Sequence, residues 1–99
     1  MIAILKEPGK KPVEIIINNE LTELQTIVEG PIEYYGLTKD MGIICNEEGK
    51  LRGLPFNAII CGMDFVGTIL FVGVQDGEFV ECPMSLGKAR RLFPNLWKD

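Results

Sequence analysis

The ten residues from Phe65 to Val74 constrain the fold more than any other part of the sequence. The run reads Phe-Val-Gly-Thr-Ile-Leu-Phe-Val-Gly-Val and carries no charge. A run this apolar and β-branched is typical of a strand that is buried on both faces. We therefore expect a central strand over 65–74, a hairpin turn at Asp76-Gly77 and a return strand over Phe79–Cys82.

The chain before this run alternates strand and helix signals. Two apolar segments, Ile2–Lys6 and Val13–Ile17, flank a Pro-Gly turn and are expected to form a hairpin. Apolar residues at helical spacing then predict a helix from Leu21 to Val28. Asn18-Asn19 offers its N-cap, and Gly30-Pro31 is a typical stop signal.

The remaining elements complete an α+β pattern. Strands are expected over Ile32–Leu37 and Met41–Cys45, and Ala58–Gly62 fits either a helical turn or a short strand. Ser85 is expected to cap a last helix over Leu86–Phe93, with Leu96 and Trp97 packing back on the core. We expect one domain, 1–99, with a mixed or antiparallel sheet of about five to six strands. One main helix would pack on this sheet, in a β-grasp-like or half-barrel arrangement.

A polar loop from Cys45 to Asn57 interrupts the strand pattern. It combines two glycines, a proline and two asparagines with charged residues, which is typical of a tight turn. We expect Gly49 at positive φ and brief pairing over Leu51–Leu54. One interpretation is an ordered structural loop. The other is a binding edge made of Asn46, Glu47, Glu48, Lys50, Arg52 and Asn57.

Acidic and basic residues are segregated along the sequence. Between Pro12 and Glu48 there are eight acids and one base, whereas from Ser85 to Lys98 there are four bases and no acid. One interpretation is ordinary solvated surface. The other is an acidic face that binds a basic protein surface, carried by Glu20, Glu23, Glu29 and Glu33 with the loop acids. A net charge of −4 argues against direct nucleic-acid binding by this chain.

The composition excludes several kinds of catalytic and metal site. The chain has no histidine, a single serine and no Cys-x-x-Cys pair, so neither a nucleophilic triad nor a zinc site is expected. The odd number of cysteines favours buried free thiols. Cys45 is the best nucleophile candidate because it borders the loop. We expect no enzyme, no cofactor and no metal.

Targeting signals are also missing from the sequence. No apolar run approaches the length of a membrane span, and no export signal precedes the first strand. A cytoplasmic location is the resulting expectation.

Three blocks of the sequence resemble one known family. They are ILKEPGKKPVEIIINNELTELQTIVEGPIE, IICNEEGKLRGLPFN, and DFVGTILFVG followed by DGEFVEC. The chain is similar in these blocks to the phage- and plasmid-associated family catalogued as domain of unknown function 3846. It departs from the family between the Leu-Pro-x-Asn and the next Asp, where only Ala58 to Met63 intervenes.

The resemblance implies a biological setting and no catalytic residues. Genes of this family travel on mobile elements among small accessory proteins, several of which disarm host defences. The expectation is therefore an inhibitor of a host defence nuclease with a basic channel, of anti-CRISPR or anti-restriction type. The alternative is a sponge for a nucleotide signal that uses the Asn46–Asn57 loop. Self-association of this chain into a homodimer is a further alternative.

Overall fold

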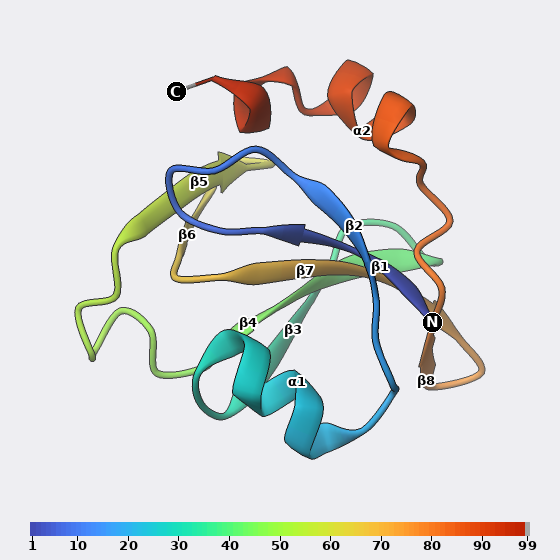
Figure 1. Cartoon of the computed structure of the whole chain (residues 1–99), viewed down its shortest axis with the longest axis horizontal. Helices are drawn as coiled ribbons and strands as arrows, with labels where there is room; N and C mark the ends of the chain where they lie inside the picture. The colour runs from blue at the N-terminus through green and yellow to red at the C-terminus, as the bar shows by residue number, and fades with distance from the viewer. Residues whose placement is uncertain (99) are drawn as a thin grey trace.

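The computed structural model describes residues 1–98 and contains an antiparallel sheet with elements packed on both faces (Figure 1). Its elements in chain order are β1 (Ile2–Lys6), β2 (Val13–Ile16), α1 (Leu21–Val28), β3 (Ile32–Gly36), β4 (Met41–Asn46), β5 (Phe56–Ile60), β6 (Met63–Val66), β7 (Ile69–Gln75), β8 (Glu78–Val80), α2 (Leu86–Leu92) and the 3₁₀ helix η1 (Pro94–Trp97).

Strand β7 lies in the middle of the six-stranded sheet. The strand order is β2-β1-β7-β4-β3, with β8 also paired to β7, and every pairing is antiparallel. The first five residues of β7 are buried, as a central strand requires. The predicted α+β class, with a sheet of five to six strands, is confirmed.

The predicted single strand over 65–74 is wrong at its N-terminal end. Gly67 has a φ of +69°, which only glycine adopts readily, and its N–H donates to the Pro55 carbonyl at 2.7 Å. The chain turns there, so β6 leaves the main sheet and pairs with β5 in a separate two-stranded sheet. This pairing also resolves the ambiguous segment after Asn57, which is a strand.

The two faces of the sheet carry two hydrophobic cores. On one face Leu24 and Val28 of α1 pack against buried residues of β4 and β7. The β5–β6 hairpin, α2 and η1 cover the other face, and Figure 1 shows α1 and α2 on opposite sides of the sheet. Leu96 is buried and Trp97 packs against this second core, as predicted.

The N-cap predicted for α1 is wrong, whereas the N-cap predicted for α2 is confirmed. The N-cap of α1 is Glu20, without a side-chain cap. Asn18 instead donates its backbone N–H to Glu23 Oε2 at 2.7 Å, so the predicted asparagine cap is wrong. Ser85 caps α2 as predicted, since its hydroxyl accepts from the Lys88 N–H at 3.1 Å.

Positive φ angles occur at one expected turn and not at another. Asp76 and Gly77 have φ of 51° and 78°, which confirms the hairpin turn between β7 and β8. In the polar loop it is Gly53, with φ of 67°, and not Gly49 that adopts this conformation. The expected pairing of Leu51–Leu54 does not form, and residues 51–53 lie in turns instead.

Candidate functional site

The polar loop between β4 and β5 is fastened to the C-terminal end of α1. Asn46 donates its Nδ2 to the Val28 carbonyl at 3.0 Å, and the Arg52 guanidinium donates to the Glu29 carbonyl. These groups satisfy carbonyls that the end of a helix leaves without partners. The loop therefore helps to terminate α1 and to hold it against the sheet.

Asn57 fixes the other end of the loop. Its Nδ2 donates to the Lys6 carbonyl at 2.8 Å and to the Gly67 carbonyl at 2.7 Å. Its Oδ1 is buried without a hydrogen-bond partner among residues 1–98. The amide joins β1 to the turn at which the chain leaves β6 for β7.

Burial assigns both loop asparagines a structural role. Asn46 is 5% exposed and Asn57 is 9% exposed, so neither amide is available to a partner. One N–H group of Arg52 donates to the Glu29 carbonyl at the end of α1. Of the six predicted loop contacts, the exposed side chains left for binding are therefore Glu47, Glu48, Lys50 and Arg52, whose guanidinium keeps further donors.

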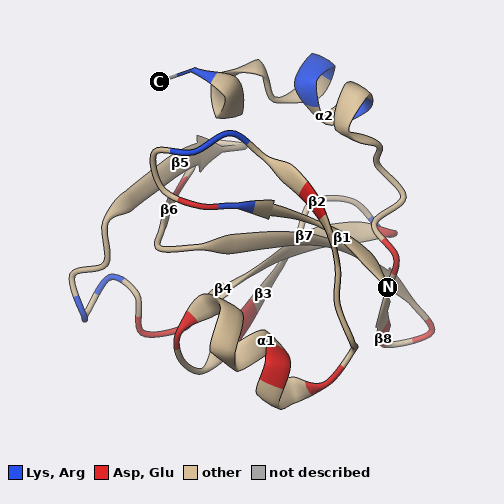
Figure 2. Ribbon diagram, in the orientation of Figure 1, with Lys and Arg blue, Asp and Glu red and all other residues tan. Residues whose placement is uncertain are grey.

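Carboxylates gather around α1. Glu20, Glu23 and Glu29 lie on the helix or at its ends. Glu47 lies close to the C-terminal end of the helix, because its N–H donates to the Pro31 carbonyl at 2.8 Å. Figure 2 shows this side of the molecule as predominantly acidic. We define the acidic α1 surface as Glu20, Glu23, Glu29, Glu47 and Glu48.

The basic residues of α2 and of the β1–β2 loop lie on the opposite side of the molecule, whereas Arg52 lies beside the C-terminal end of α1, where it donates to the Glu29 carbonyl. In Figure 2 the cations of α2 and of the β1–β2 loop lie on the side away from α1, and those of the β4–β5 loop lie near the acidic residues that follow β4. Within residues 1–98 the structure contains one ion pair, Lys10 with Glu7 at 3.8 Å. Within the described chain, none of the carboxylates of the acidic α1 surface forms an ion pair.

Glu33 lies on a different face of the sheet from the acids of α1, although it lines one cleft together with Glu47. Glu33 precedes Tyr35 by two residues on β3, so both side chains lie on the sheet face opposite α1. Tyr35 packs there against Phe65, with ring centroids 5.6 Å apart in a T-shaped pair. Glu33 therefore belongs to a separate cleft and not to the acidic α1 surface.

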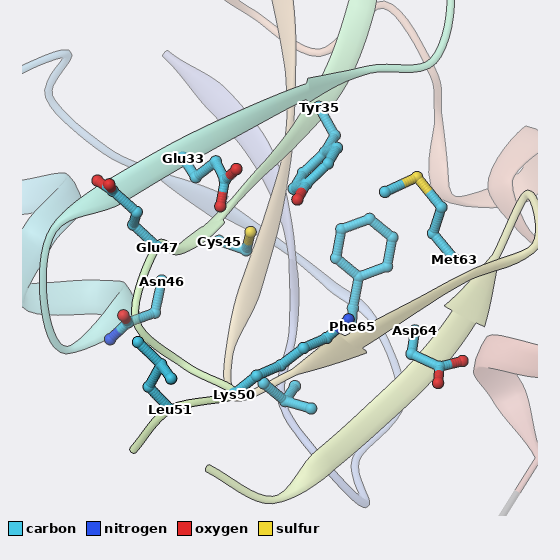
Figure 3. A pocket seen from close by; sticks show the side chains of 11 residues that line it. Glu33, Tyr35, Cys45, Asn46, Glu47, Lys50, Leu51, Met63, Asp64 and Phe65 are labelled. Carbon is cyan, nitrogen blue, oxygen red and sulfur yellow. The ribbon is translucent and has the colours of Figure 1, made fainter. Parts of the chain in front are cut away.

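This cleft lies between the end of β3 and β4 and the β5–β6 hairpin (Figure 3). Its volume is about 150 Å³. Figure 3 shows the Glu33 carboxylate near Cys45 and Tyr35, while the carboxylates of Glu47 and Asp64 lie at the margin. The sequence did not indicate Asp64 or Phe65 as neighbours of this cleft, because Phe65 was expected at the start of the central strand and Asp64 was assigned to no element.

A comparison with models of protein families identifies the family of this chain. The model described as "Domain of unknown function (DUF3846)" matches residues 1–93. The chain belongs to the DUF3846 family. No curated protein and no solved structure matches the chain.

The DUF3846 match covers α1, the polar loop and the cleft. The family description states no function, so the role of these features has to be argued from their chemistry. None of the helices in residues 1–98 combines the length and apolarity needed to cross a membrane.

The chemistry of Cys45 does not favour nucleophilic catalysis. Burial, with a further effect of the Glu33 charge, raises the pKa of its thiol to about 11, although Lys50 acts in the opposite direction. The thiolate is the nucleophilic form, and at neutral pH this side chain is almost entirely protonated. Cys45 is a buried core residue at the base of the cleft.

The three cysteines are free but differ in exposure. Cys45 is buried, Cys82 is half-buried and Cys61 is exposed, so the expectation that all three are buried is wrong for Cys61. Cys61 lies in the β5–β6 turn, where its φ is 51°.

We expect one fast thiol reaction per chain at pH 8. Cys61 should react with a disulfide reagent such as DTNB at the rate of an exposed thiol. Cys45 should react at least about tenfold more slowly, because burial limits access and its thiolate fraction is small. The measurement is a stopped-flow trace of the wild type and of Cys61→Ser, which should lose the fast phase. A fast phase that survives in Cys61→Ser and disappears in Cys45→Ser would contradict this assignment.

Proposed function

We propose that this protein is a non-enzymatic binding module whose acidic α1 surface docks on a basic surface of another protein. The observation that carries the proposal is the gathering of acidic residues around α1, none of whose carboxylates forms an ion pair in the described chain. A surface of one sign attracts an oppositely charged partner and orients it on approach.

The partner that fits this surface is a host enzyme that acts on nucleic acids. We propose that this enzyme is a defence nuclease. Such enzymes present basic channels to bind phosphates, and a row of carboxylates can occupy the same channel. The proposal includes a cytoplasmic location and an origin on a mobile genetic element, in line with an anti-CRISPR or anti-restriction role.

The charges of the loop support the alternative function, a sponge for a nucleotide signal, less than they support protein binding. Arg52 donates to the Glu29 carbonyl, and the cleft beside Lys50 is lined by Glu33, Glu47 and Asp64. These carboxylates repel a phosphate group. A volume of about 150 Å³ is also below the roughly 300 Å³ at which small-molecule sites begin.

The test compares two variants that each remove three negative charges. In the first, Glu20, Glu23 and Glu29 are replaced by glutamine, which keeps the Glu23 side-chain oxygen that accepts from Asn18. In the matched control, Asp76→Asn, Glu78→Gln and Glu81→Gln change acids in and after the β7–β8 hairpin. Each variant and the wild type serve as bait in a host lysate at low salt, with quantitative mass spectrometry.

We expect a specific protein with a basic surface to be captured by the wild type and by the control. The α1 variant should capture roughly tenfold less of it, because three interfacial charge pairs are lost. Equal capture by both variants, or no specific protein in any capture, would contradict the proposal.

A further inference from the structure

We propose that the cleft between β3, β4 and the β5–β6 hairpin receives the guanidinium group of one arginine side chain of the partner. Glu33 would pair with its charge, and the half-buried ring of Tyr35, supported by the buried Phe65, would form the aromatic wall. This inference rests on the proposed function and deepens it by naming the group that the cleft recognises.

The charge of the cleft favours a cation. Three carboxylates, Glu33, Glu47 and Asp64, line it against one ammonium group, that of Lys50. None of these four groups has an ion-pair partner within residues 1–98. No group of residues in the described chain is arranged to hold a metal ion. An organic cation with hydrogen-bond donors suits these separated carboxylates.

The walls of the cleft favour a planar cation. Tyr35 and Phe65 meet edge to face, and Figure 3 shows both rings bordering the same space as the Glu33 carboxylate. A guanidinium stacks on an aromatic face and pairs with a carboxylate through two parallel N–H groups, which a lysine ammonium cannot do.

The base of the cleft offers an unused polar group. The Cys45 side chain is 6% exposed and makes no hydrogen bond in residues 1–98, and in Figure 3 it lies between Glu33 and Phe65. Sulfur is a weak acceptor for N–H donors. Such a buried thiol beside a carboxylate is a suitable base for a bound guanidinium.

The size of the cleft limits the ligand to one side-chain end. Its volume of about 150 Å³ is about half of the roughly 300 Å³ at which small-molecule sites begin. That space accommodates a guanidinium and its last methylene groups, but it excludes a nucleotide or a folded peptide. Glu47 belongs both to the cleft lining and to the acidic α1 surface, so a partner on that surface can present an arginine to the cleft.

The test uses two probes of equal shape and different charge. N-acetylarginine amide carries the guanidinium, and N-acetylcitrulline amide is its neutral counterpart. Each is titrated into ¹⁵N-labelled protein at low salt. We expect saturable shifts with the arginine probe at the amides of Tyr35, Cys45 and Phe65, with a dissociation constant in the millimolar range, and no comparable shifts with citrulline.

A conservative variant and a control variant locate the binding. Glu33→Gln should weaken binding of the arginine probe at least about fivefold, whereas Glu78→Gln on β8 should leave it unchanged. Equal shifts with both probes, shifts confined to α1, or shifts that Glu33→Gln leaves intact would overturn the inference.

A second readout does not depend on how well Glu33→Gln folds. Glu33, as a hydrogen-bond partner and as a negative charge, raises the pKa of the Tyr35 phenol. A guanidinium bound beside Glu33 opposes this effect, so the arginine probe should lower the pKa of Tyr35 in a Tyr34→Phe background. Citrulline should not. An unchanged Tyr35 titration at saturating arginine probe would overturn the inference, whereas the lysate comparison tests the α1 surface independently.

Discussion

Gly42→Ala is expected to destabilise the protein by about 3 kcal/mol, toward the upper end of what overpacking a core costs. Gly42 is buried in β4 and pairs with Gly36 of β3. An added Cβ would overlap the Tyr35 backbone carbonyl and the Tyr34 phenol, whose Cζ lies 2.5 Å from its position. The backbone of β3 cannot retreat without breaking its ladder to β4.

Thermal unfolding followed by circular dichroism measures this effect. A loss of about 3 kcal/mol corresponds to a fall in Tm of roughly 10–25 °C for a domain of this size. Gly87→Ala is the matched control, because its Cβ meets only Ser85 Oγ, at 3.9 Å. Since Gly87 lies in α2, that change should be neutral or stabilise by up to about 1 kcal/mol. Equal melting temperatures for the two variants would contradict the close approach of β3 to Gly42 on which this prediction rests.

Asn57→Ala is expected to cost about 2–6 kcal/mol, because two buried carbonyls lose their donor at a cost of about 1–3 kcal/mol each. Those carbonyls belong to Lys6 and Gly67, so the loss acts on both β1 and the turn between β6 and β7. Asn57→Asp should be at least as harmful, since it places a carboxylate oxygen against two carbonyl oxygens.

Urea unfolding gives this difference directly as a shift of the midpoint. Asn95→Ala is the control, because Asn95 makes one exposed hydrogen bond to the Ile59 carbonyl at 2.9 Å. That variant should lose less than about 1 kcal/mol. If Asn57→Ala were no less stable than Asn95→Ala, the structural role assigned to the end of the loop would fail.

The α+β class was predictable because its signals are local. The helical spacing from Leu21 to Val28, the Asp76-Gly77 turn and the Ser85 cap each occupy a few neighbouring residues. The structure places an element at each of them. Propensity and turn chemistry suffice where the competing conformations are few.

The break at Gly67 was not predictable in the same way. Within an apolar run a glycine fits a bulge, a close crossing or a turn. What selects the turn is distant: the Pro55 carbonyl accepts from the Gly67 N–H, and the Asn57 amide binds the Gly67 carbonyl. The composition of the cleft depends on this break, since β6 carries Asp64 and Phe65. That is why these residues were missed.

The polar loop illustrates how a conspicuous sequence stretch can serve structure more than binding. Its asparagines are buried donors, and its arginine donates to the end of α1. The same polar residue types would be expected at a binding edge, so composition alone could not separate the two interpretations. The acidic residues around α1 are different, because the described fold gives them no cationic partner.

The salt dependence of partner binding tests the central claim most directly. The dissociation constant of the captured protein is measured between 50 and 500 mM NaCl for the wild type, the triple-glutamine α1 variant and the β7–β8 control. If the acidic α1 surface carries recognition, affinity for the wild type and the control should fall steeply with salt, because exposed charges are screened. The α1 variant should bind weakly at low salt and show a much flatter dependence. Identical salt dependence for all three proteins would contradict the claim that these carboxylates recognise the partner.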